Sequence, residues 1–416
     1  MKVLISAFSC GPGRGSDPGV GWNWVQQVSR RHEVWLITTD EYQEDIERAI
    51  TPNIHVTFLP AYRTWSRLQK MFIPGLDWLY YYCWQWKAYQ AGRRLHAEVG
   101  FDLAHNVTFA SWRVPSFLCL LPVPMVWGPV GGGGAIPAGL RGELGWKGRL
   151  FEGIRHLCQQ ASRYDPLVRL TMRRATVILA GNQETAQLVP ASRHSKVRLM
   201  SCGGMSPKER LMAVVPGEKP AGFIILFVAL LRPLKGGSLA IRAMQRLSSR
   251  RADAKLLFLG GGGQERARLE ALVRELGLAG QVQFLGGLPR AQVLGWMEAS
   301  DALLFPSLRD SGPMVVLEAM NAGKPVVCLD LGGPGFFVTE KCGIKVKPGN
   351  PEQVISDLAA ALEKLAGDPG LRRAMGEAGR QRVRETFDWD KRGERMMEIY
   401  REAVGKVEGQ AGLESA

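Results

Sequence analysis

The chain has 416 residues, 46% of them hydrophobic and 22% charged, which is typical of a globular protein long enough for two domains. No run reaches the roughly 20 apolar residues that a helix needs to span a bilayer. The net charge of +14 indicates an anionic partner, but no helix-turn-helix, zinc-finger or RNA-recognition signature accompanies it, so we do not expect nucleic acid to be that partner.

The first element expected is a β-strand over residues 2–8 (KVLISAF), because its apolar run is too short for a signal peptide. A glycine-rich stretch follows, before a helix expected from about Trp22 to Arg30, and its glycines are Gly11, Gly13, Gly15, Gly19 and Gly21. A turn of this kind lets backbone N–H groups approach a phosphate closely. It lacks the GK[ST] of a P-loop.

Strands are expected at 33–39 (EVWLITT) and 54–60 (IHVTFLP). Their alternation with helices predicts a doubly wound α/β domain. Between Tyr62 and Tyr89 the chain holds ten aromatic residues interleaved with Arg and Lys. This pattern suits a helix at a membrane interface, where it would meet anionic lipid. It equally suits an aromatic core helix pair lining an acceptor cleft, and the sequence leaves both interpretations open.

His105 is expected at the end of the next strand, where ligands of open α/β sheets collect. A further strand and a glycine loop, Gly131 to Gly134, come after it. From Arg141 to Arg174 eight basic residues stand against three acids in helical sequence. That stretch is either a cationic face for lipid phosphate or an ordinary solvated helix face.

Four parts of the chain follow from these patterns: an N-terminal Rossmann-like domain over 1–200, a linker over 201–221, a second Rossmann-like domain over 222–386 and a C-terminal helix over 387–416. Seven cysteines without a CxxC pair predict reduced thiols in a cytoplasmic protein. No histidine pair has metal-ligand spacing, and Asp388-Trp389-Asp390 is interpreted as a helix cap, so we expect no metal site.

The stretch from Leu303 to Val327 (LLFPSLRDSGPMVVLEAMNAGKPVV) predicts strand, loop and helix. Gly312 and Pro313 stand where the helix should begin. The free N–H groups of Met314, Val315 and Val316, with the helix dipole, would form an anion site. Asp310 and Glu318, on either side of it, could accept hydrogen bonds from hydroxyls. A ligand with hydroxyls on both sides of a diphosphate is a nucleotide sugar.

The spacing of Asp310 and Glu318 within PS…SGPxxxxEAMxxGxPVV resembles retaining glycosyltransferases of the GT-B fold, family 4, which have two doubly wound Rossmann-like domains facing across a cleft. Asp310 stands where that family usually has Glu. The resemblance extends to the family's GRLxxxKG segment, where Lys235 matches the diphosphate lysine. Leu230 occupies the usual Arg position, and Arg232 is expected to supply the guanidinium. It also implies that Gly19 and Gly21 contact the donor phosphate and that His105 lies near the sugar.

The resemblance therefore implies transfer of a hexose-type sugar, with retention, from a UDP- or GDP-linked donor to a glycan or lipid-linked acceptor in cell-envelope polysaccharide synthesis. It implies no cofactor and no metal, since Lys235, Arg232 and the helix start would stabilise the leaving diphosphate. Peripheral contact with an anionic membrane, at the inner face of the cell membrane, is a further expectation. The alternatives are a degenerate nucleotide-sugar-binding protein and another GT-B enzyme such as a sugar-nucleotide epimerase.

Overall fold

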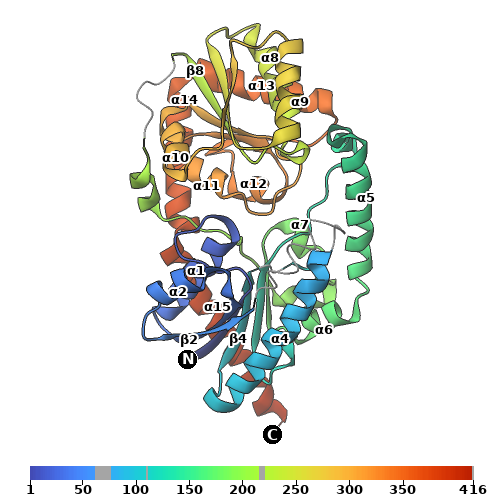
Figure 1. Ribbon diagram of the computed structural model, residues 1–416, viewed down its shortest axis with the longest axis vertical. Coiled ribbons are helices and arrows are strands. Elements are labelled where there is room, and N and C mark those ends of the chain that lie inside the picture. Colours follow the sequence, from blue (N-terminus) through green and yellow to red (C-terminus); the bar gives the residue numbers. More distant parts are fainter. Residues whose placement is uncertain (61–75, 109–110, 215–220, 415–416) are drawn as a thin grey trace. The chain divides into compact units, whose positions relative to one another are not determined.

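The computed structural model describes residues 1–60, 76–108, 111–214 and 221–414, and these fall into two compact units. Unit 1 contains Met1–Gly133, Leu157–Gly203 and Trp389–Ala416, and unit 2 contains Gly134–His156 and Gly204–Asp388. Each unit has one parallel sheet with helices packed against it (Figure 1). The predicted fold class, with two doubly wound Rossmann-like domains, is confirmed.

Unit 1 is built on a seven-stranded sheet of order β3-β2-β1-β4-β5-β6-β7. Its strands are β1 (Lys2–Ala7), β2 (Glu33–Thr39), β3 (Ile54–Leu59), β4 (Leu103–Thr108), β5 (Met125–Val130), β6 (Val177–Ala180) and β7 (Val197–Leu199). Its helices are α1 (Ser16–Ser29), α2 (Gln43–Ala49), α4 (Leu76–Val99), α6 (Pro166–Arg174), α7 (Gln183–Ala186) and α15 (Trp389–Glu414). The strand order reverses between β1 and β4.

The strands of unit 1 alternate their side chains between two cores. Val3 and Ile5 of β1 pack with residues of α1 and α15, while Leu4 packs with residues of α4 and α6 on the other face. Both faces of a parallel sheet are therefore buried, which explains why a strand such as β6 is continuously apolar.

Unit 2 has a six-stranded sheet of order β10-β9-β8-β11-β12-β13. Its strands are β8 (Phe223–Val228), β9 (Ala254–Leu259), β10 (Val282–Gly286), β11 (Ala302–Phe305), β12 (Val326–Leu329) and β13 (Gly343–Val346). Its helices are α8 (Gly237–Ser248), α9 (Gly263–Glu275), α10 (Arg290–Ala299), α11 (Met314–Asn321), α12 (Gly332–Phe337), α13 (Pro351–Gly367) and α14 (Pro369–Arg382). The side chains of β8 again alternate between two cores, one with α8, α9 and α13 and one with α10 and α11.

One segment, residues 134–156, groups with unit 2 although the sequence placed it in the first domain. Its turn Ala138–Leu144 inserts Ile136, Leu140 and Leu144 into the core of unit 2. The segment then continues into helix α5 (Gly145–Ser162), which is green in Figure 1. The predicted boundary at 1–200 missed this because apolar residues within a loop give no sign of which core they join.

Helix α1 begins at Ser16, so the predicted start at about Trp22 is wrong. Gly19 and Gly21 lie inside the helix rather than in the preceding loop. A Cβ atom at Gly19 would stand 2.0 Å from the Arg14 carbonyl oxygen, and one at Gly21 would stand 2.4 Å from that of Ser9. These two glycines allow the first turns of α1 to pack closely against the chain that leaves β1.

The aromatic stretch from Tyr62 to Tyr89 lies partly outside the described residues, and its described part belongs to α4. Tyr81 and Trp84 are buried in the core of unit 1, whereas Trp86 is exposed. The ring of Phe8, in the loop after β1, meets both buried rings edge-on at about 5 Å. These contacts favour the core interpretation for the described part of α4.

Among the described residues no helix is long and apolar enough to cross a membrane. All seven cysteines are free thiols in the structure.

Candidate functional site

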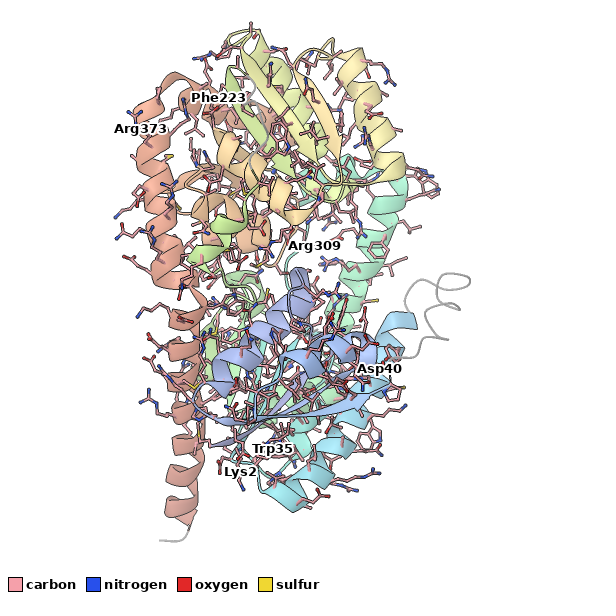
Figure 2. All side chains as sticks on the ribbon, turned by 60° about the vertical axis from the view of Figure 1, so that its left-hand side comes forward. Lys2, Trp35, Asp40, Phe223, Arg309 and Arg373 are labelled. Atoms are coloured by element: carbon pink, nitrogen blue, oxygen red, sulfur yellow. The ribbon has the colours of Figure 1, made fainter. Side chains whose placement is uncertain are left out.

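The candidate site lies in unit 2 at the carboxyl ends of its strands, where the strand order reverses between β8 and β11. Open α/β sheets bind ligands at such a switch point because the loops on either side diverge there. The loop after β8 carries Lys235 and the loop after β11 carries Asp310. Figure 2 labels Arg309 in this second loop and Phe223 at the opposite end of the sheet.

Lys235 and Asp310 meet across the switch point. The ammonium group of Lys235 forms an ion pair with a carboxylate oxygen of Asp310, and both side chains are largely buried, with 22% and 17% of their surfaces exposed. The ammonium also stands 5.6 Å from the centre of the Phe305 ring. A lysine ammonium has three N–H donors, so this pair leaves capacity on Lys235 for a second anionic group.

Glycines hold the two loops close together. Gly236 has φ +74°, and a Cβ atom there would stand 2.2 Å from the Pro306 carbonyl oxygen. Gly332, at the start of α12, has φ +54°, and its Cβ would stand 2.2 Å from the Asp310 carbonyl oxygen. The backbone N–H of Gly333 donates to that same oxygen at 2.8 Å. The loop that carries Asp310 is therefore fixed from both sides by backbone that tolerates no side chain.

Helix α11 begins beside this loop with an uncapped N-terminus. Pro313 is its N-cap rather than its first helical residue, and no side chain caps the helix. The N–H of Val316 donates to the Pro313 carbonyl oxygen at 3.1 Å, so the prediction that it is free is wrong. Among the described residues no hydrogen bond takes up the N–H groups of Met314 and Val315. Together with the preceding Gly312, this helix start retains the geometry of an anion site.

Glu318 lies one turn into α11 with 12% of its side chain exposed, and its carboxylate accepts a hydrogen bond from Arg290 at 2.8 Å. Arg290, the first residue of α10, also pairs with Glu209. Burial raises the pKa of Glu318 above its usual value, and Arg290 opposes that rise while Glu209 adds to it. Glu318 is thus a partly buried acceptor, held in place by an arginine that sequence reasoning missed.

A second charged group borders Asp310. Arg309 forms an ion pair with Glu152 of α5, and both residues lie in unit 2. Arg155 donates to both oxygens of Glu152 at 2.7–3.1 Å and to the Gly134 carbonyl oxygen at 2.8 Å. Burial raises the pKa of Glu152, but the hydrogen bond from Arg155 and the charge of Arg309 outweigh it, so the net shift is downward. This buried carboxylate positions Arg309 and, with it, the neighbouring Asp310.

Arg232 and Leu230 stand at the margin of the site. Arg232 is exposed and starts the short turn Pro233–Lys235, and Leu230 is 53% exposed. Gly260 and Gly262 pack against this stretch, since a Cβ atom at Gly260 would stand 1.7 Å from the Ala229 carbonyl oxygen. Arg232 thus lies in the same loop as Lys235, and the role expected for its guanidinium stays a prediction.

His105 lies within β4 rather than at its end, so the predicted position is wrong. The side chain is fully buried in unit 1, with Nδ1 2.6 Å from the Tyr400 hydroxyl and Nε2 2.7 Å from the Gly128 carbonyl oxygen. Burial lowers its pKa to about 4. This placement indicates a structural histidine and gives no support to contact with a sugar.

The residues predicted in unit 2 thus gather at one edge of its sheet: Lys235, Asp310, Gly312, Pro313, Met314, Val315 and Glu318. Arg290, Glu209, Arg309 and Glu152 join them, and the sequence offered no signal for these four because their roles depend on contacts between distant segments. The arrangement offers an ammonium and a helix start for an anion, with a carboxylate on either side for hydroxyl groups.

Comparison with known families gives one match, which lies within unit 2. Residues 211–382 match the family model described as glycosyl transferases group 1. This part of the chain is therefore a group 1 glycosyltransferase domain, and it contains Arg232, Lys235, Arg290, Asp310 and Glu318.

Curated relatives match less than half of the chain. The chain is 36% identical over 186 residues to the D-inositol 3-phosphate glycosyltransferase of Corynebacterium jeikeium. It is 31% identical over 196 residues to that of Kribbella flavida. These matches cover 43% and 45% of the chain and the same shares of the two relatives, so the chain spans less than half the length of the curated relatives it matches.

Solved structures match over nearly the whole chain. The sucrose-phosphate synthase of Thermosynechococcus elongatus has a TM-score of 0.68 at 20% identity, covering 97% of this chain and 99% of that one. HepE of Anabaena, solved in complex with UDP, has a TM-score of 0.63 at 17% identity, covering 96% and 99%. At this identity the likeness shows the fold alone, which is that of GT-B glycosyltransferases.

Proposed function

We propose that the protein is a retaining, metal-independent glycosyltransferase that moves a hexose-type sugar from a UDP- or GDP-linked donor to a glycan or lipid-linked acceptor. The observation that carries this proposal is the convergence of Lys235, Asp310, Glu318 and the uncapped start of α11 at the switch point of unit 2. The group 1 match over residues 211–382 supports it independently.

The donor would bind with its diphosphate at the N-terminus of α11 and at Lys235. Glu318 would accept hydrogen bonds from the ribose, and Arg290 would hold that carboxylate in place. Asp310 would accept hydrogen bonds from the transferring sugar. Asp310 is one methylene shorter than the usual Glu, and its loop is fixed by the glycine contacts and the Arg309–Glu152 pair.

Cleavage of the bond between the anomeric carbon and the phosphate oxygen puts negative charge on the diphosphate and positive character on the sugar. Lys235 and the helix start would stabilise the diphosphate as preorganised positive groups, and Arg232 would add a smaller contribution from the margin of the site. They would supply the positive charge that a metal ion supplies in other transferases. We propose further that the first turns of α1, with Gly19 and Gly21, form the part of unit 1 that approaches the donor.

The test is release of free UDP or GDP from a panel of nucleotide sugars, with and without a lipid or glycan acceptor extract. Lys235→Ala serves as the blank, and chelator is added in a parallel series. The proposal predicts release from one donor that vanishes in the variant and persists with chelator. Nucleotide binding without release from any donor would instead identify a degenerate binding protein, and conversion of a donor without release of free nucleotide would identify an epimerase.

A further inference from the structure

Helix α5 buries polar side chains and exposes apolar ones, the reverse of an ordinary surface helix. Its inward residues Glu152, Arg155 and Gln159 are all less than 9% exposed. They recur every three or four positions and so share one face of the helix. Each makes a polar contact within the fold: Gln159 donates to the Gly133 carbonyl oxygen at 2.6 Å, and the other two form the group with Arg309.

The outward face of α5 is an apolar stripe with the same helical spacing. Four apolar residues recur along it at intervals of four, four and three positions, and Phe151 lies beside them. Each exposes more than half of its surface: Trp146 (66%), Leu150 (60%), Ile154 (53%), Leu157 (69%) and Phe151 (61%). Single exposed apolar residues are ordinary, but five neighbouring ones along one helix mark an interaction surface. We call this row the α5 stripe.

Cations border the α5 stripe. Lys147 and Arg149 are exposed on the same turns, and the ammonium of Lys147 stands 5.4 Å from the centre of the Trp146 ring. None of the ion pairs among the described residues involves either cation. The nearby acids are already engaged within the fold: Glu143 accepts from Ser238 at 2.5 Å, and Glu152 pairs with Arg155 and Arg309.

We propose that the α5 stripe docks on the surface of an anionic lipid membrane, with α5 lying in the plane of the interface. An interfacial helix combines an apolar face rich in Trp, Phe and Leu with flanking Lys and Arg that meet lipid phosphates, and α5 has both. A second copy of the chain is a poorer occupant, because it would bring Lys147 and Arg149 of both copies together in a protein of net charge +14.

The inward face of α5 gives this docking a consequence for the site. Glu152 holds Arg309, the neighbour of Asp310, in unit 2. A membrane that binds the outward face therefore holds the helix whose inward face positions the candidate sugar-binding loop. The inference does not depend on the donor or on turnover, since the α5 stripe contains none of the residues proposed to bind the diphosphate.

The experiment is sedimentation of the full chain with vesicles of phosphatidylcholine alone and of phosphatidylcholine mixed with phosphatidylglycerol. The stripe variant is the triple substitution Trp146→Gln, Leu150→Gln and Ile154→Gln. The matched control replaces three exposed apolar residues elsewhere, Ile50, Leu199 and Val214, which are 40%, 46% and 57% exposed. Thermal melting of each variant verifies that it folds.

We expect the wild-type chain and the control to sediment with the anionic vesicles and the stripe variant to lose at least about tenfold in binding. The variant Lys147→Gln/Arg149→Gln should lose roughly fivefold for each cation and should no longer prefer the anionic vesicles. Failure of the wild-type chain to bind anionic vesicles, or equal binding by the stripe variant, overturns the proposal. A wild-type dimer in light scattering that the stripe variant converts to monomer would assign the α5 stripe to a second copy instead.

Discussion

The two units share one topology but fill their switch points differently. In unit 1 the strand order reverses between β1 and β4, and neutral groups meet there: the Thr108 hydroxyl donates to the Ser9 carbonyl oxygen at 2.9 Å, with His105 fully buried nearby in β4. In unit 2 it reverses between β8 and β11, and an ammonium, a carboxylate and an uncapped helix start meet there.

The difference shows that a doubly wound sheet provides a place for a ligand but not its chemistry. The charge that a nucleotide diphosphate requires is gathered in unit 2 by loops from different strands. Unit 1 uses its buried polar residues to hold its own strands and helices together, as the hydrogen bond between His105 and Tyr400 shows. Substitutions in the two units should therefore have different kinds of effect.

The largest effect is expected in unit 2, from Lys235→Ala. Removal of one preorganised cation should cost about 3 kcal/mol, roughly a hundredfold in turnover, without unfolding the protein. Steady-state release of nucleotide measures it. The control is Lys406→Ala, which breaks a lysine–glutamate pair of 2.7 Å on the C-terminal helix and should leave turnover unchanged. Near-normal turnover of Lys235→Ala would remove the lysine from the site.

In unit 1, His105→Asn should reduce stability rather than catalysis. Loss of the hydrogen bonds to Tyr400 and Gly128 should cost about 2 kcal/mol at pH 7.5. Burial lowers the pKa of His105 to about 4, so its contribution to stability is full above the unfolded value of 6.5 and is lost as pH falls toward 4. Urea denaturation should thus show a difference between wild type and variant that shrinks on acidification. A variant that stays fully stable but loses turnover would return His105 to the active site.

A smaller effect is expected from Glu318→Gln, which should weaken nucleotide binding about tenfold by removing a charged hydrogen-bond acceptor. Burial raises the pKa of Glu318, and only its ionised form offers the full acceptor. Nucleotide binding by the wild type should therefore weaken as the pH falls through the raised pKa of Glu318, which lies above the ordinary 4.5. Binding by the variant should not change over this pH range. Calorimetry at several pH values measures both. Glu363→Gln, which breaks a pair with Arg250 at 2.6 Å, is the control; an unaltered pH profile in Glu318→Gln would contradict the assignment.

The smallest effect is expected from Arg232→Gln, about threefold in turnover, because the exposed guanidinium is screened by solvent. If Arg232 contributes, the difference in turnover between wild type and variant should decrease as salt is added, because salt screens the guanidinium charge. Turnover measured at several salt concentrations tests this. Equal turnover of the two proteins at low salt would mean that Arg232 does not replace the arginine that the family usually has at the position of Leu230. Lys235 and the start of α11 would then act alone.

The sequence predicted the sheets and most of the unit 2 site because these depend on local patterns. Apolar runs such as residues 33–39 and 223–228 form strands wherever both faces are buried. The spacing of Asp310 and Glu318 across a glycine and a proline predicts a loop and a helix start within a residue.

Other features escaped prediction because they depend on contacts between distant segments. The first part of α5 belongs to unit 2 because three apolar residues before it enter a core formed by the chain from Phe223 onward. The reversed faces of α5 follow from partners such as Arg309. His105 was misplaced because a histidine within an apolar strand looks the same in sequence whether it ends the strand or is buried inside it. The helical position of Gly19 was missed because glycines commonly indicate loops, whereas here they allow close packing.

The most direct test of the central claim is hydrogen exchange of the full chain with and without UDP or GDP, followed by mass spectrometry of its peptides. If the charged switch point of unit 2 holds the diphosphate, amides in residues 230–236 and 310–318 should gain the strongest protection, and Lys235→Ala should abolish it. Protection confined to the loop after β1 in unit 1, with residues 310–318 unchanged, would contradict the assignment of the donor to unit 2.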